Sequence, residues 1–123
     1  MILYVFQIYS ITDMEDRVRE IVEYAFNNGI YGVFKNTSIY IEIKKSRIEP
    51  YNDPVILLLN IHIPEPMRKK GLFTAILDEL MKKAHGHYLQ IGPFVTDESE
   101  FIIKILRRKN FTQVSPFSMR IKC

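Results

Sequence analysis

Three cations followed by a glycine, Arg68-Lys69-Lys70-Gly71, lie between an apolar segment and a segment with helical periodicity. A helix start exposes N–H groups that lack intrahelical acceptors, and it carries the positive end of the helix dipole. Glycine also lets a ligand approach the backbone closely. This combination is typical of a binding site for an anion, most often a phosphate group. The chain has neither GxGxxG nor the Gly-Lys-Ser/Thr ending of a nucleotide-triphosphate loop, which excludes those two phosphate sites.

Two polar residues, Asn60 and His62, alternate at the end of the apolar segment that precedes this loop. Histidine titrates near neutrality and can take a proton from a reacting amine, directly or through water. The pair is therefore our catalytic candidate. The alternative is a buried polar pair satisfied by neighbouring backbone groups. Tyr51, Glu42 and Tyr88 carry suitable groups too, but the sequence gives no positional reason to choose them.

The composition predicts one ordinary globular domain covering residues 1–123. Of the 123 residues, 47% are hydrophobic and 25% are charged, which argues against a disordered chain or a disulfide scaffold. The lone cysteine, Cys123, cannot form an internal disulfide, so a reduced, cytoplasmic protein is expected. No apolar run reaches the roughly 18 residues of a membrane span. We expect no membrane partner and no metal site.

Charge is spread unevenly along the chain. Residues 1–66 carry 6 basic and 9 acidic side chains, whereas residues 67–123 carry 11 basic and 5 acidic ones. The second part, which begins with the cationic run, should therefore attract anions. A solvated cationic surface is the simpler alternative. The cations are not interleaved with aromatic residues, which argues against a nucleic-acid interface.

Periodicity and turn residues predict alternating strands and helices, in the order β–α–β–β–β–α–β–α–β. Strand 54–63 is nearly all apolar and is expected to be central, with both of its faces covered. The sequence thus predicts a mixed α/β fold, with a mostly antiparallel sheet and helices on both faces. The expected elements are strand 2–9, helix 12–28, a hairpin of 30–35 and 38–45 turning at Asn36-Thr37, strand 54–63, a helix from Leu72 to about Gly86, strand 87–92, a helix capped between Asp97 and Glu100, and strand 111–121.

The passage from a central strand through Arg68-Lys69-Lys70-Gly71 into a helix resembles the pyrophosphate motif of the GNAT superfamily of acyl-CoA N-acyltransferases. That motif is Gln/Arg-x-x-Gly-x-Gly/Ala, and Arg68 and Gly71 match it. Phe73 departs from it, standing where a second small residue is usual. The loop can still function if Phe73 points into the core. By order of elements the resemblance covers most of the chain, and it is best from about residue 54 to 121.

The segment "SEFIIKILRRKNF" resembles the next family motif, Asn-x-x-Ala-x-x-Phe-Tyr followed by Gly-Phe. Ser99 aligns with the Asn, and Leu106 aligns with the Tyr. Asn110-Phe111 aligns with the Gly-Phe pair, and asparagine tolerates the left-handed conformation that ends many helices. Because leucine cannot donate a proton, the family's usual tyrosine acid is missing here.

The resemblance implies a compact GNAT-like fold that binds acetyl-CoA as cosubstrate. Backbone groups of Ile61 and Ile63 would pair with the pantetheine arm, and Ser99 would meet its thiol end. The cationic side chains would contact the phosphates, although plain solubility is an alternative role for the lysines. The main-chain amides expected to hold the pyrophosphate are those of Arg68, Lys69, Lys70, Gly71, Leu72, Phe73 and Thr74.

The expected activity is transfer of an acetyl group from acetyl-CoA to an amine, on a small molecule or on a protein. A GNAT-fold module that binds coenzyme A with weak or no turnover is the alternative, supported by Leu106. A small basic nucleic-acid-binding domain is a third. The family usually has two helices between its first and second strands, but here the chain passes from Gly29 directly into the hairpin. We expect an open acceptor groove, suited to a protein substrate or closed by a second copy in a homodimer.

Overall fold

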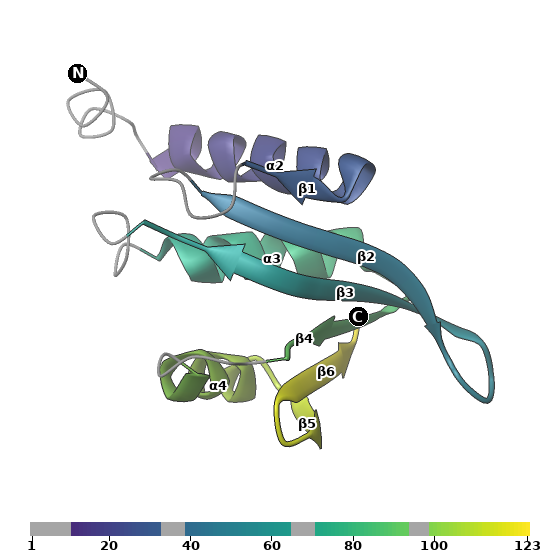
Figure 1. Cartoon of the computed structure of the whole chain (residues 1–123). Coiled ribbons are helices and arrows are strands. Elements are labelled where there is room, and N and C mark those ends of the chain that lie inside the picture. Colours follow the sequence, from purple (N-terminus) through teal and green to yellow (C-terminus); the bar gives the residue numbers. More distant parts are fainter. Residues whose placement is uncertain (1–10, 33–38, 65–70, 94–98) are drawn as a thin grey trace.

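The computed structural model describes residues 11–32, 39–64, 71–93 and 99–123 (Figure 1). Several predicted features lie outside the described residues: the strand at 2–9, the turn at Asn36-Thr37, the cap at Asp97, and the cationic residues Arg68, Lys69 and Lys70.

The described elements follow the predicted order, apart from the last strand. Helix 12–28 and strands 38–45, 54–63 and 87–92 are confirmed, with ends that differ by at most three residues. The elements are α2 (Ile11–Asn28), β1 (Ile30–Tyr31), β2 (Tyr40–Ile48), β3 (Asp53–His62), α3 (Leu72–Lys83), β4 (Tyr88–Ile91), α4 (Ser99–Arg108), β5 (Thr112–Ser115) and β6 (Ser118–Lys122).

The strands form one six-stranded sheet in the order β1-β2-β3-β4-β6-β5. Only β3 and β4 are parallel; the other four neighbouring pairs are antiparallel. The prediction of a mixed, mostly antiparallel sheet is confirmed. Within the described chain no helix intervenes between α2 and β1, which begins two residues after α2 ends.

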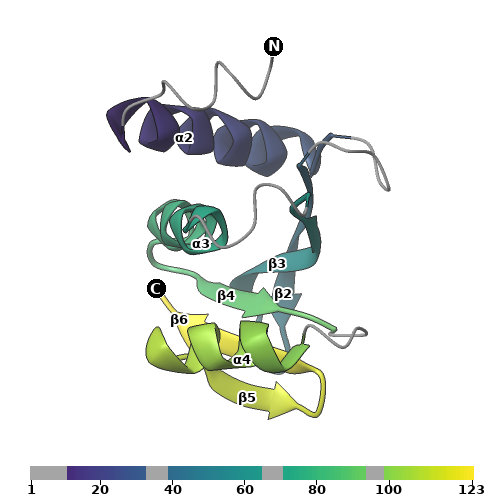
Figure 2. The ribbon, with the colours of Figure 1, turned by 90° about the vertical axis from the view of Figure 1, so that its left-hand side faces the viewer.

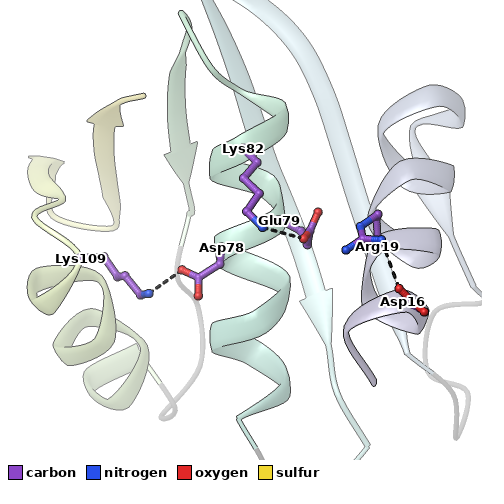
Figure 3. A network of polar contacts seen from close by, with 6 residues as sticks. All are labelled: Asp16, Arg19, Asp78, Glu79, Lys82 and Lys109. Carbon is purple, nitrogen blue, oxygen red and sulfur yellow. Dashed lines mark hydrogen bonds and ion pairs between the residues drawn. The ribbon is translucent and has the colours of Figure 1, made fainter. Parts of the chain in front are cut away.

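The prediction of helices on both faces is wrong for the described helices, which share one face of the twisted sheet (Figures 2 and 3). Lys109, just after α4, extends its Nζ to 2.5 Å from Asp78 Oδ1 on α3. On the other side of α3, Lys83 Nζ lies 3.8 Å from Glu23 Oε1 on α2. The reason is chirality. The crossovers β3–α3–β4 and β4–α4–β5 step the same way across the sheet between parallel strands, and right-handed connections then place both helices on the same side.

Register separates the two faces of the sheet. Along most of the helix face the residues are apolar and belong to a single core cluster with the three helices, whereas Lys45 and Arg47 follow on this face toward the end of β2. The helix face contains Ile41, Ile43, Ile56, Leu58, Leu89, Ile91, Met119 and Ile121. The opposite face, here called the outer face, contains Tyr40, Glu42, Lys44, Val55, Leu57, Asn60, His62, Tyr88, Gln90, Arg120 and Lys122.

Strand β3 is central, as predicted, but it is not covered equally on its two faces. Ile56 and Leu58, on the helix face, are buried. On the outer face Val55 is buried, Leu57 is half-buried and Asn60 is exposed. A continuous run of apolar residues predicts that both faces of a strand are covered. The run does not show on which side of the sheet the helices pack, and here the described helices pack on one side only.

Helix α4 ends as the sequence predicts. Asn110 has φ 70, the left-handed conformation expected of it. The N–H of Phe111 donates to the Leu106 carbonyl at 3.0 Å, and the N–H of Asn110 donates to the Arg107 carbonyl at 3.0 Å. These two bonds are the Schellman pattern, which satisfies the last carbonyls of a helix. Phe111 is thereby held in the core.

The predicted single strand at 111–121 is wrong, because this segment is the hairpin of β5 and β6. Ser115 pairs with Ser118, so Pro116 and Phe117 form the turn between the two strands. Proline lacks the N–H that a continuous strand would donate, and its fixed φ suits a turn. Proline at this position was the available sequence signal for the hairpin.

Candidate functional site

The start of α3 provides main-chain N–H groups at the end of the sheet where β3 finishes (Figure 1). Gly71, the N-cap residue, has φ 76, and a Cβ placed there would have no atom within 4 Å. The first helical bond runs from the Ala75 N–H to the Gly71 carbonyl, 2.9 Å. The N–H groups of Leu72, Phe73 and Thr74 therefore have no acceptor within the helix.

The side chains at the start of α3 are compatible with a bound anion. Leu72 is buried, and half-buried Phe73 packs against the core cluster, as required if the loop is to tolerate it. The first turn carries no acidic residue that would oppose an anion. The helix dipole and the N–H groups that have no acceptor within the helix thus make the start of α3 suitable for a negatively charged group.

Strands β3 and β4 stop pairing at this same end of the sheet. Their paired residues stop at Leu58 and Ile91, and the Gly92 N–H donates to the Leu58 carbonyl at 3.3 Å. Strand β3 continues to His62 with β2 as its neighbour. Among the described residues, no strand pairs with Leu59–His62 on the side of β4.

A bulge at Leu59 decides which way the end of β3 faces. Glu42 pairs with Asn60 and Ile43 pairs with Leu58, so Leu59 is an extra residue without a partner on β2. Without it, strict alternation would direct Asn60 into the core beside Leu58. The bulge instead turns Asn60 and His62 to the outer face. The same pairing with β2 indicates that the main-chain N–H and C=O groups of Ile61, like those of Leu58, point toward the β4 side of β3.

Three side chains of the outer face are joined by hydrogen bonds. Asn60 Nδ2 donates to Glu42 Oε1 at 2.7 Å, and the Tyr40 hydroxyl donates to the same oxygen at 3.3 Å. His62 pairs with Tyr40 across the two strands. The alternative of a buried polar pair is wrong, because Asn60 is exposed and His62 is half-buried.

Glu42 is the functional candidate that the sequence named without a positional reason. The alternation of Ile39, Ile41 and Ile43 already put Tyr40 and Glu42 on the opposite side of β2. What the sequence lacked was the register between β2 and β3, including the bulge. Knowledge of that register would have placed Glu42 next to Asn60.

The environment of Tyr40 favours the neutral phenol. Burial raises the pKa of Tyr40 above its ordinary value, and the charge of Glu42 and the hydrogen bond to it act in the same direction. Tyr40 therefore remains a hydrogen-bond donor at neutral and mildly alkaline pH.

The cluster can orient and deprotonate an amine. A carboxylate only accepts hydrogen bonds, so the Nδ2 side of the Asn60 amide faces Glu42 and the Oδ1 side faces away. Oδ1 can then accept a hydrogen bond from a bound amine. Glu42 and His62 are both groups that can accept a proton.

Other candidate residues are placed elsewhere or have different surroundings. Ser99 begins α4, and Leu106 is fully buried in the core. Tyr88 pairs with Val55, toward the opposite end of β3, with the Arg120 guanidinium 5.8 Å from its ring centroid. Tyr51 is 83% exposed in the turn between β2 and β3.

The side chains of Ile61 and Ile63 are half-buried and pack against the core cluster. Burial raises the pKa of the Cys123 thiol, which makes this cysteine a poorer nucleophile than an exposed one.

Neither a metal site nor a membrane span occurs in the parts of the chain that the structure describes. No group of three His, Cys, Asp or Glu side chains there could hold a metal ion. None of the helices in those parts is long and apolar enough to cross a bilayer.

The sequence matches no protein-family model, and no curated protein matches it. Function is therefore inferred from the chemistry and geometry of the site itself.

Proposed function

We propose that the protein is an N-acetyltransferase with a GNAT-like fold, which moves an acetyl group from acetyl-CoA to an amine. The observation that carries this proposal is the coincidence of three features at one end of the sheet. Strand β3 outruns its parallel neighbour β4, α3 begins there at Gly71, and the bulge turns Asn60 and His62 to the outer face. An extended arm ending in a pyrophosphate suits a strand edge next to a helix start.

Binding of coenzyme A would be divided between backbone and side chains. The amides of Leu72, Phe73 and Thr74 would hold the pyrophosphate, together with those from Arg68 to Gly71. The cations of this loop would add charge-assisted contacts. Main-chain groups of Ile61 and Ile63 would pair with the pantetheine arm as an added strand, and Ser99 would lie near its thiol end.

The reaction needs a free amine held against the thioester. The amine nitrogen attacks the carbonyl carbon, the new C–N bond forms, and the C–S bond breaks to release the thiolate of coenzyme A. The amine proton passes to His62, directly or through water, while Asn60 Oδ1 orients the amine. Glu42 fixes the Asn60 amide and is a second possible proton acceptor.

The buried Leu106 leaves the departing thiolate without a proton from this helix position. A thiolate is a fair leaving group, so positioning of the two reactants can carry the reaction, with solvent supplying the proton. The same observation supports the alternative function, a coenzyme A-binding module with little or no turnover.

Two measurements test the proposal in sequence. Calorimetry should show acetyl-CoA binding that Arg68→Glu abolishes. Arg108→Glu, an equal charge change at the exposed end of α4, should leave binding intact. Absence of binding to the unaltered protein would overturn both the enzyme and the module.

Thiol release in the presence of an amine panel then separates the two remaining functions. Release that depends on an amine and falls in Asn60→Ala and His62→Ala supports the enzyme. Binding of acetyl-CoA without amine-dependent release supports the module.

The direct passage from α2 to β1 motivates a proposal about the acceptor. With no second helix there, the acceptor groove would be open and suited to an amine on a protein, or closed by a second copy of the chain. Acetylation rates should then be higher on intact proteins than on free small amines, and the opposite preference would contradict an open groove.

A further inference from the structure

A cavity of about 480 Å³ lies at the end of the sheet opposite to Gly71. It is formed under the C-terminal ends of α2 and α3, which lie together in Figure 1, and against the first residues of β3. Four basic side chains line it: Lys45 and Arg47 from β2, Lys83 from the end of α3, and His87 just before β4. None of the lining residues is acidic.

The cations of this cavity are only partly neutralised by the protein. Lys83 Nζ lies 3.8 Å from Glu23 Oε1, and Glu23 is exposed outside the lining. Arg47 Nη1 donates to the Asn52 carbonyl at 3.0 Å, which uses one of its five N–H donors. Lys45 Nζ lies 4.3 Å from the centroid of the Phe26 ring, a contact that leaves its ammonium hydrogens available. Like charges held around one hollow repel one another, and a bound anion would remove that cost.

The rest of the wall is apolar. Phe26 contributes from α2, and Pro54, Val55 and Ile56 contribute from β3. Ile56, whose side chain is on the helix face, is buried and forms a firm floor. A volume of this size and a mixture of apolar wall with a few converging charges are typical of small-molecule sites.

We propose that this cavity binds a small organic phosphate, with its phosphate group held by Lys45, Arg47 and Lys83 and its ring or alkyl part against Phe26. The hollow is open to solvent on one side, and its volume of about 480 Å³ is suited to one small molecule. The site is separate from the start of α3. That helix has twelve residues and so is about 18 Å long, and Lys83 is its last residue.

A fluorescent probe, naphthyl phosphate, tests the proposal on the full chain. It combines the two features that the cavity requires, whereas naphthol lacks the charge and inorganic phosphate lacks the apolar part. The cavity variant carries Lys45→Gln and Lys83→Gln. Its matched control carries Lys44→Gln and Lys82→Gln, which change the net charge equally at neighbouring residues that do not line the cavity.

The expected results are selective. Naphthyl phosphate should bind the unaltered protein more tightly than naphthol or inorganic phosphate does. The cavity variant should lose at least about tenfold in affinity, because two charge-assisted contacts disappear. The control variant should stay within about twofold of the unaltered protein, since dispersed surface charges contribute little. Thermal unfolding of both variants should remain cooperative, because Lys44, Lys45 and Lys82 are exposed and Lys83 is partly exposed.

Other results would overturn the proposal. These are no binding of naphthyl phosphate, equal losses in the cavity and control variants, or naphthol binding as tightly as its phosphate. Arg68→Glu provides the last arm, because it should leave the affinity for naphthyl phosphate unchanged. Loss of binding in Arg68→Glu but not in the cavity variant would assign the anion to the start of α3 instead.

Discussion

The two faces of the sheet use the same strands for different purposes. On the helix face, Ile41, Ile56 and Leu58 are at most 3% exposed and form the core with the three helices. On the outer face, the same strands carry a hydrogen-bonded cluster of Tyr40, Glu42 and Asn60. A pleated strand always offers two faces, so one sequence segment can contribute apolar residues to the core on one side and polar residues to a hydrogen-bonded cluster on the other.

The difference between the faces depends on one residue at the end of β3. Leu59 has no partner on β2, and this extra residue keeps Asn60 and His62 off the helix face. In a regular strand of the same sequence these two polar side chains would enter the core, at the cost of burying unsatisfied groups. The bulge thus lets an apolar central strand end in a polar site.

The largest expected effect comes from deletions that alter the register. Deleting Ile41 from β2 shifts the residues before it by one position, which places Tyr40 on the helix face and Ile39 on the outer face. We therefore expect loss of cooperative unfolding in urea. Deleting one of Leu57, Leu58 or Leu59 gives the same shorter sequence whichever is removed, and it restores regular pairing with Asn60 still on the outer face. This second deletion should retain a cooperative transition, and an unfolded product would contradict the assigned bulge.

The three consecutive leucines sharpen the comparison by substitution. Leu58→Ala should cost about 2–5 kcal/mol of unfolding free energy, because Leu58 is 2% exposed on the helix face. Leu57→Ala and Leu59→Ala should cost clearly less, since both side chains are half-buried. Urea denaturation measures all three. Equal losses would mean that the outer face is as closely packed as the helix face.

Tyr40→Phe tests a polar contact of the outer face. Loss of the hydrogen bond to Glu42 should cost about 1 kcal/mol at neutral pH. The pKa of Tyr40 is raised by burial, followed by the charge and the hydrogen bond of Glu42, so in the folded state the phenol keeps its proton after it has ionised in the unfolded chain. Its contribution is therefore complete below about pH 10 and is lost as the pH rises through the folded pKa.

Urea denaturation at a series of alkaline pH values checks this sign. The unaltered protein should lose stability more steeply above about pH 10 than Tyr40→Phe does. If the two proteins lost stability in parallel as the pH rises, Tyr40 would have the same pKa in the folded and the unfolded chain. Burial of its hydroxyl would then have no energetic consequence.

The smallest effect is expected for Gln90→Ala, also on the outer face. Arg120 Nε and Nη2 both donate to Gln90 Oε1, at 3.0 and 2.7 Å. Because this pair is only partly buried, its removal should cost less than about 1 kcal/mol. A loss as large as that of Leu58→Ala would show that polar contacts of the outer face stabilise the sheet as much as the core does.

Local patterns in the sequence determined much of the fold. Helical spacing of apolar residues predicted α2 and α3, alternation predicted the two sides of β2, and the tolerance of asparagine for left-handed geometry predicted the end of α4 at Asn110. These features depend on residues within a few positions of one another, and such interactions are visible in a linear sequence.

The tertiary structure decided what depends on distant partners. Leu57, Leu58 and Leu59 are the same residue type in the sequence. Only pairing with β2 and packing under the helices make Leu57 an outer-face residue, Leu58 a core residue and Leu59 a bulge. The same pairing placed Glu42 beside Asn60, eighteen positions away. Side-chain types state what chemistry is available, whereas register and the handedness of the crossovers determine which side chains meet.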